Sequence, residues 1–141
     1  MPRSIITLVV LLVSLAAARA DIRIVSSAGG EVGSYLRLFA AVRESGQRVI
    51  IDGPCLSACT LVLSAIPPDR ICVTPRAVLG FHAARWIDRQ GRQYAAPDET
   101  RLVTATYPVR VRTWIKRNGG LTQKPIFLRG RQLAALYPHC R

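Results

Sequence analysis

The chain has 141 residues, of which half are hydrophobic, and its 20 lysines and arginines against eight aspartates and glutamates give a formal net charge of +12. This length leaves room for one domain with a sizeable core and excludes a second one. The cations are scattered from Arg23 to Arg141 without a run or interleaved aromatics, which disfavours a nucleic-acid groove and favours a solvated cationic surface.

The first twenty residues predict a secretory signal peptide. Arg3 precedes an apolar segment over residues 5–18, and Ala18-Arg19-Ala20 fits the small-x-small rule for cleavage before Asp21. The apolar segment is short for a hydrocarbon core of about 30 Å, which disfavours a stable transmembrane anchor. An uncleaved anchor remains the alternative. We therefore expect residues 21–141 to be a single exported, periplasmic domain.

Export removes nucleic acid from the expected partners. Arg3 and Arg19 would leave with the leader, so the remaining domain carries a formal net charge of +10. Such a domain could bind an anionic envelope surface such as lipopolysaccharide, anionic lipid or the cell wall.

Apolar periodicity and breakers predict strands that alternate with helices over the first half of the domain. The expected elements are strand 22–25, helix 31–46, strand 48–52, helix 57–66, and strands 71–74 and 78–82. Strands alternating with helices at this pace favour parallel β-α units with right-handed crossovers. The fold class is therefore α/β, with a mostly parallel sheet flanked by helices.

The apolar periodicity is less regular in the second half of the domain. Residues 83–97 predict a loop or a distorted hairpin, and residues 98–118 predict a helix that Asp98 caps and that Pro108 kinks or splits. A short apolar run at 126–128 and a last short helix at 131–137 follow.

Two side chains suit an activated nucleophile. Ser57 follows the breakers Gly53 and Pro54 and begins a predicted helix, where free N–H groups favour an alkoxide or an anion. His82 comes at the end of an apolar run, and a serine and a histidine so placed can form a nucleophile and its base. The structural alternatives are a helix N-cap for the serine and a strand-end histidine bonded to a backbone carbonyl.

A motif that spans the chain carries a family resemblance. Ser27-Ala28-Gly29-Gly30 opens a helical pattern, Gly53 precedes Ser57 by four residues, and His82 follows Ser57 by twenty-five. This order resembles the proteolytic subunit of the Clp protease and the wider ClpP/crotonase superfamily. More narrowly, the chain is similar to small exported ClpP-like proteins of bacteria. The resemblance covers residues 22–140 and implies a ClpP/crotonase-like fold; relatives form rings, which makes a homo-oligomer a further expectation.

The resemblance also implies roles for four residues. Ser57 would be the nucleophile and His82 the proton shuttle, while the backbone N–H groups of Gly30 and Ala58 would form the oxyanion hole. For Gly30, a tight turn is the simpler alternative.

The chain departs from the family at the third catalytic residue. The aspartate of the peptidases would fall at Gly120-Leu121-Thr122, and no carboxylate occurs after Glu99. The candidates for orienting His82 are Asp98, Asp52, Thr122 or a backbone carbonyl. A missing acid can leave slower catalysis, so the departure does not decide activity.

Four cysteines, Cys55, Cys59, Cys72 and Cys140, fall in the exported part. An even count in an oxidising compartment predicts two disulfides, with three pairings open. The resemblance favours Cys72–Cys140, because the C-terminal segment of a ClpP-like fold packs on the strand that holds Cys72, and this leaves Cys55–Cys59. A CxxC redox motif is absent, and zinc binding with His139 lacks a second ligand pair, so no metal or other cofactor is expected.

These observations lead to two hypotheses. The first is an exported serine hydrolase, most simply a peptidase, acting on a peptide or another acyl substrate. The second is a catalytically inactive ClpP-like binding module of the cell envelope, stabilised by disulfides. Crotonase-like acyl-CoA chemistry is disfavoured because export separates the protein from CoA.

Overall fold

The structure is a computed structural model that describes residues 20–141. The expected signal peptide lies outside the described residues, apart from Ala20. Between residues 20 and 141, no helix combines the length and the apolar character needed to cross a membrane.

The first sheet is parallel throughout and has the order β1-β2-β4. Its strands are β1 (Ile22–Ile24), β2 (Val49–Ile51) and β4 (Ile71–Val73). All residues of β2 and β4 are buried, as expected of parallel strands covered on both faces, which are rich in valine and isoleucine. The C-terminal segment extends this sheet beyond β4 through a parallel bridge between Val73 and His139.

The second sheet has the order β3-β5-β8. It consists of β3 (Pro54–Leu56), β5 (Val78–Phe81) and β8 (Ile126–Arg129), with β3 parallel and β8 antiparallel to β5. The chain passes from the first sheet to the second at Gly53, where an added Cβ would lie 2.0 Å from the carbonyl oxygen of Val25. Only glycine permits this approach, and the break between β2 and β3 falls at this residue. The expected single, mostly parallel sheet is therefore divided into two small sheets that are partly parallel.

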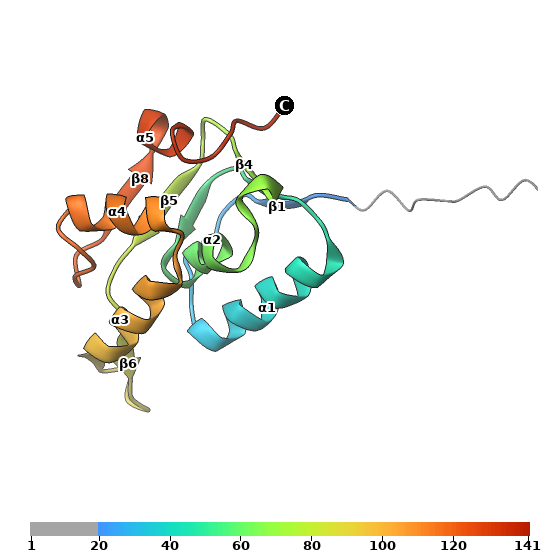
Figure 1. Cartoon of the computed structure of the whole chain (residues 1–141). Helices are drawn as coiled ribbons and strands as arrows, with labels where there is room; N and C mark the ends of the chain where they lie inside the picture. Colours follow the sequence, from blue (N-terminus) through green and yellow to red (C-terminus); the bar gives the residue numbers. More distant parts are fainter. Residues whose placement is uncertain (1–19) are drawn as a thin grey trace, which may run out of the picture.

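Helices cover the sheets in this mixed α/β fold. They are α1 (Val32–Ser45), α2 (Val62–Ala65), α3 (Pro97–Thr106), α4 (Val109–Arg117) and α5 (Gly130–Ala134), with 3₁₀ turns η1 (Ser57–Leu61) and η2 (Pro68–Arg70). Figure 1 shows α1 on one side of the molecule and α4, α5 and β8 on the opposite side. Helix α1 begins where the Glu31 carboxylate accepts hydrogen bonds from the Gly33 and Ser34 amides, and it ends at Gly46 in the left-handed conformation.

Most of the predicted elements are present, with corrections at Asp98 and at the region 54–66. Pro108 splits the region 98–118 into α3 and α4, as one of the two expectations had it, and residues 83–97 contain the hairpin of β6 (Arg85–Ile87) and β7 (Gln93–Ala95). Asp98 does not cap α3, because Pro97 already occupies the first turn and the cap residue is Ala96. The expected helix 57–66 is instead a 3₁₀ turn followed by four α-helical residues, and the residues just before it form β3.

Both disulfides are present, with the pairings Cys55–Cys59 and Cys72–Cys140. The second closes a span of 68 residues and ties the C-terminal segment to β4, a stabilisation of roughly 4 kcal/mol in the chain-entropy model. The described residues bury one hydrophobic core, to which both three-stranded sheets contribute.

Candidate functional site

Ser57 is the first residue of η1, directly after β3, and its backbone is strained. Its φ is 55°, and within residues 20–141 it is the only non-glycine residue with a positive φ. The left-handed conformation disfavours any residue with a Cβ, at a cost of about 1–3 kcal/mol. Such strain at a strand-to-helix turn is a feature of exposed nucleophiles in hydrolases. No sequence pattern predicted it, because serine has no preference for this conformation.

The glycine segment predicted from the motif lies directly against this turn. Ser27 pairs with β3, donating from its N–H to the Pro54 carbonyl at 2.8 Å and accepting from the Leu56 N–H at 2.9 Å. A Cβ on Gly29 would lie 2.6 Å from the Ser57 Cβ and 2.9 Å from the Ala58 nitrogen. Gly29 was not singled out as a site residue, but the structure makes it the residue that lets the segment approach Ser57.

The two amides proposed for the oxyanion hole have no acceptor within the described part of the chain. Neither the Gly30 N–H nor the Ala58 N–H donates a hydrogen bond to residues 20–141. The Ala58 N–H belongs to the first turn of η1, where no intrahelical partner exists. Because Gly29 contacts both Ser57 and Ala58, the two amides belong to the same small region.

Parallel pairing brings the serine and the histidine to the same edge of the second sheet. In the register of β3 with β5, Leu56 lies opposite Gly80. Ser57 therefore follows its strand by one residue, and His82 follows Gly80 by two. Between residues 20 and 141, however, no hydrogen bond joins the Ser57 hydroxyl to the His82 ring.

The His82 ring is oriented by a backbone carbonyl. Its Nδ1 lies 2.7 Å from the carbonyl oxygen of Ala83. An oxygen at this distance requires a proton on Nδ1, which leaves Nε2 unprotonated in the neutral ring and able to accept a proton. This is the tautomer that a general base needs.

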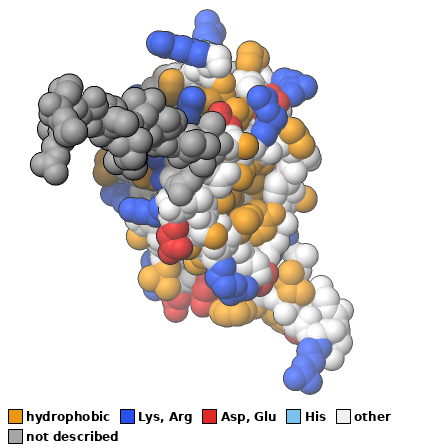
Figure 2. Space-filling model, turned by 90° about the vertical axis from the view of Figure 1, so that its right-hand side faces the viewer, with side chains coloured by type: hydrophobic (Ala, Val, Ile, Leu, Met, Phe, Trp, Pro, Cys, Tyr) orange, Lys and Arg blue, Asp and Glu red, His pale blue; other side chains and the backbone are white. Residues whose placement is uncertain are grey.

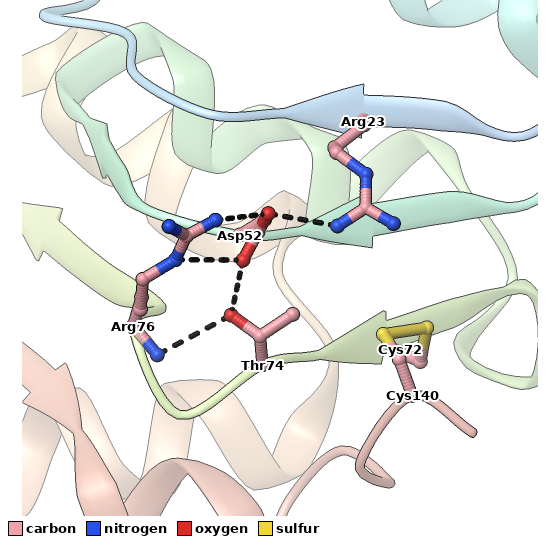
Figure 3. A network of polar contacts seen from close by, with 6 residues as sticks. All are labelled: Arg23, Asp52, Cys72, Thr74, Arg76 and Cys140. Atoms are coloured by element: carbon pink, nitrogen blue, oxygen red, sulfur yellow. Dashed lines mark hydrogen bonds and ion pairs between the residues drawn. A yellow bond between two sulfur atoms is a disulfide. The ribbon is translucent and has the colours of Figure 1, made fainter.

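The three expected orienting side chains do not reach the ring. Asp52 is 5% exposed and binds Arg23, Thr74 and Arg76 instead, with oxygen distances of 2.7 Å to Arg23 Nη1 and 2.7 Å to Thr74 Oγ1. Figure 3 shows these side chains converging on Asp52 from β1 and from the turn after β4. The hydrogen bonds from Arg76, Thr74 and Arg23 hold the pKa of Asp52 far below its usual range.

The two other candidates are also occupied. Asp98 is exposed and pairs with Arg101 at 2.6 Å. Thr122 lies near the histidine only through its backbone, where its carbonyl oxygen accepts a hydrogen bond from the Ala83 N–H at 2.7 Å. The carbonyl alternative is thus the one that the contacts of His82 favour.

Two buried hydroxyl groups, those of Thr60 and Tyr107, support the strained turn through hydrogen bonds. Thr60 Oγ1 lies 2.6 Å from the Ser57 carbonyl oxygen and 2.6 Å from the Tyr107 hydroxyl. Thr60 has one hydroxyl proton and donates it to the carbonyl, so Tyr107 must donate to Thr60. Burial raises the pKa of Tyr107 to about 12, which keeps this donor protonated.

Tyr107 also contacts β5, the strand that leads to His82. Its ring packs edge-on against Phe81, with 5.4 Å between centroids, and Phe81 directly precedes His82. No local sequence signal marks Thr60 or Tyr107 as site residues, because the two residues lie 47 positions apart.

A disulfide and an arginine flank the two reactive residues. The Cys55–Cys59 bond spans Ser57, from β3 to η1, with 5.2 Å between the two Cα atoms. Arg85 places Nη2 3.5 Å from His82 Nδ1 and donates from Nη1 to Gln93, while its buried Nε has no partner in the described region.

A hollow of about 560 Å³ opens between α3, α4 and Leu121. Thr100, in its wall, accepts a hydrogen bond from the Ala84 N–H at 2.9 Å. The hollow therefore lies beside the segment that follows His82, although neither Ser57 nor His82 lines it.

In comparisons with known proteins, no family model and no curated protein matches this chain.

Proposed function

We propose that this chain is an exported serine hydrolase, a peptidase in its simplest form, built on a ClpP/crotonase-like fold. The observation that carries the proposal is the left-handed φ of Ser57, directly after β3 and beside β5, the strand that ends one residue before His82. Strain at a single polar residue supports a functional role, because a structural turn here would favour glycine. The parallel β1-β2-β4 sheet and the Gly29-Gly30 segment support the family assignment.

The proposed chemistry is acyl transfer in two steps. Ser57 Oγ attacks the acyl carbon, and His82 Nε2 takes the hydroxyl proton while Nδ1–H stays on the Ala83 carbonyl. The Gly30 and Ala58 amides donate hydrogen bonds to the developing oxyanion. The imidazolium then protonates the leaving group. In the second step His82 takes a proton from water, the resulting hydroxide attacks the acyl carbon, and His82 returns the proton to Ser57 Oγ as the acyl–oxygen bond breaks.

This site would be a slow catalyst. A carbonyl oxygen carries only a partial charge, so it stabilises the imidazolium less than an aspartate would. The Ser57 hydroxyl and the ring must also approach each other when substrate binds, and catalytic hydrogen bonds often tighten in this way. No metal or organic cofactor is required by these steps. Export to the periplasm and an acyl or peptide substrate are parts of the same proposal.

Labelling with a fluorophosphonate probe tests the proposal directly. The probe phosphonylates an activated serine, so oxidised residues 21–141 should be labelled and Ser57→Ala should not. Ser26→Ala removes an exposed serine nearby and should be labelled like the parent. His82→Ala should lower the labelling rate by at least about 10²-fold through loss of the base. Labelling that persists in Ser57→Ala, or that is absent from the folded parent, would refute the mechanism.

The second candidate is a binding module without catalysis. The observation in its favour is that every side chain expected behind the His82 ring binds elsewhere or is turned to other partners. On this account the Ser57→Ala variant would bind peptides as well as the parent does, and the parent would show no labelling.

A further inference from the structure

The β6–β7 hairpin presents large apolar side chains to solvent. Trp86 is 60% exposed, Ile87 66% and Tyr94 49%. Trp86 lies directly opposite Tyr94 in the antiparallel register, while Ile87 lies opposite Gln93. The hairpin projects from the lower end of the molecule, where it forms a lobe in the space-filling view (Figures 1 and 2). It is rooted in the body by the hydrogen bond from the Ala96 N–H to the Ala84 carbonyl.

These side chains occupy both faces of the ribbon. Successive residues of a strand point to opposite faces, so Trp86 and Tyr94 share one face and Ile87 lies on the other. A flat protein surface packed on a two-stranded ribbon covers one face and leaves the second in water. A lipid headgroup layer surrounds an inserted ribbon and covers both.

The turn of the hairpin is closed by hydrogen bonds to Asp88, and the hairpin carries net positive charge. Asp88 accepts hydrogen bonds from the N–H groups of Gln90 and Arg92, both at 2.9 Å, and pairs with Arg92 Nε at 2.7 Å. The carboxylate is therefore neutralised within the turn. Arg89 is exposed and forms no ion pair with the described residues. Three arginines and one aspartate between residues 85 and 95 leave a net charge of +2.

We infer that this hairpin docks the protein onto a membrane surface rich in anionic phospholipid. Tryptophan and tyrosine prefer the headgroup region, where an apolar ring and a polar atom are both accommodated. Arg89 and its neighbours complement the phosphate charge. A second copy of the chain fits poorly, because residues 21–141 carry a net charge of +10 and would repel each other. This inference does not depend on the proposed hydrolase activity.

Binding of oxidised residues 21–141 to vesicles provides the test. The probes are vesicles of phosphatidylcholine with phosphatidylglycerol and vesicles of phosphatidylcholine alone, compared by sedimentation at low and high salt. We expect binding to the anionic vesicles that weakens with salt, and little binding to the neutral ones. In a Trp114→Phe background, Trp86 emission should shift to shorter wavelength on the anionic vesicles.

Two pairs of matched variants locate the contact. Trp86→Ala should lower the partition coefficient about tenfold. Leu102→Ala, which removes an apolar side chain that is 70% exposed and lies outside the hairpin, should leave the partition coefficient unchanged. Arg89→Gln should lower it about fivefold, and Arg117→Gln, the loss of an exposed charge on α4, should lower it much less. Circular dichroism of each variant shows that the fold is retained.

Several results would overturn the inference. Equal effects of Arg89→Gln and Arg117→Gln would mean that only total charge matters. Equal binding of Trp86→Ala and Leu102→Ala would remove the hairpin from the contact. Binding to insoluble peptidoglycan without binding to anionic vesicles would assign the aromatic pair to a glycan instead.

Discussion

At the scale of the residue, the site depends on backbone strain at Ser57 and on the hydrogen bonds that hold it. A left-handed residue with a Cβ persists only where the surrounding contacts determine it. Here the Cys55–Cys59 bond spans the residue, and Thr60 Oγ1 donates to its carbonyl at 2.6 Å.

The strain itself is measurable by two substitutions at one position. Ser57→Ala keeps a Cβ at a φ of 55°, whereas Ser57→Gly removes it. We expect the free energy of unfolding to be about 1 kcal/mol higher for Ser57→Gly than for Ser57→Ala. This difference already includes the entropy cost of glycine. Urea denaturation of both variants provides the measurement. A more stable alanine variant would show that the turn is unstrained.

The buried hydroxyl of Tyr107 is expected to support the turn. Tyr107→Phe removes the donor to Thr60 and should lower the free energy of unfolding by about 1 kcal/mol, and with it the rate of Ser57 labelling. Tyr137→Phe is the matched control, because its buried hydroxyl has no partner among the described residues and its loss should be neutral or stabilising. Equal effects of the two variants on stability and labelling would contradict a role for the hydrogen bond.

At the scale of the element, the approach of the segment 27–30 to η1 decides whether the two proposed oxyanion amides can work together. Gly29 and Gly91 have similar positive φ values, +84° and +79°, but different surroundings. A Cβ at Gly29 would meet the Leu56 carbonyl oxygen at 2.5 Å, whereas one at Gly91 would meet nothing within 4 Å.

This contrast separates packing from backbone strain. Gly91→Ala should lower the free energy of unfolding by about 1 kcal/mol through strain alone. Gly29→Ala adds a clash with rigid backbone, so we expect a loss of at least about 3 kcal/mol and loss of Ser57 labelling. Thermal and urea unfolding of the two variants, side by side, measures the difference. Similar losses would mean that the segment 27–30 moves away from Ser57 without cost.

At the scale of the whole molecule, Asp52 links the first sheet to the turn that leads into the second. It joins Arg23 of β1 to Thr74 and Arg76, which stand between β4 and β5 (Figure 3). The pKa of the Asp52 carboxyl is lower in the folded protein than in the unfolded chain. The contacts of the folded state therefore stabilise the ionised form of this carboxyl more than its protonated form.

The pH dependence of stability follows from the sign of that shift. The contribution of Asp52 is complete above the ordinary carboxyl pKa of 3.8 and is lost as the pH falls below it toward the folded value. Asp52→Asn should therefore destabilise the protein at neutral pH and flatten the acid decline. Unfolding free energies between about pH 6 and pH 2 test this. An unchanged slope below about pH 4 would contradict the assignment.

The sequence by itself determined the features that local chemistry controls. Helix α1 ends at Ser45-Gly46 because glycine accepts a left-handed C-cap, and Pro108 separates α3 from α4 because it cannot continue the hydrogen-bond ladder. The strands of the first sheet follow from short branched apolar runs. The motif also indicated Ser57, His82 and the glycine segment, which the folded chain brings to one region.

Only the tertiary structure decided the features that depend on distant residues. One such feature is the positive φ of Ser57. The others are contacts between remote segments: the ion pairs of Asp52 with two arginines and the hydrogen bond between Tyr107 and Thr60. The expected α-helix over 57–66 is a 3₁₀ turn followed by the short helix α2, and the Cys55–Cys59 disulfide spans the start of this turn. Local propensity is worth tenths of a kcal/mol per residue, and such long-range packing and cross-links outweigh it.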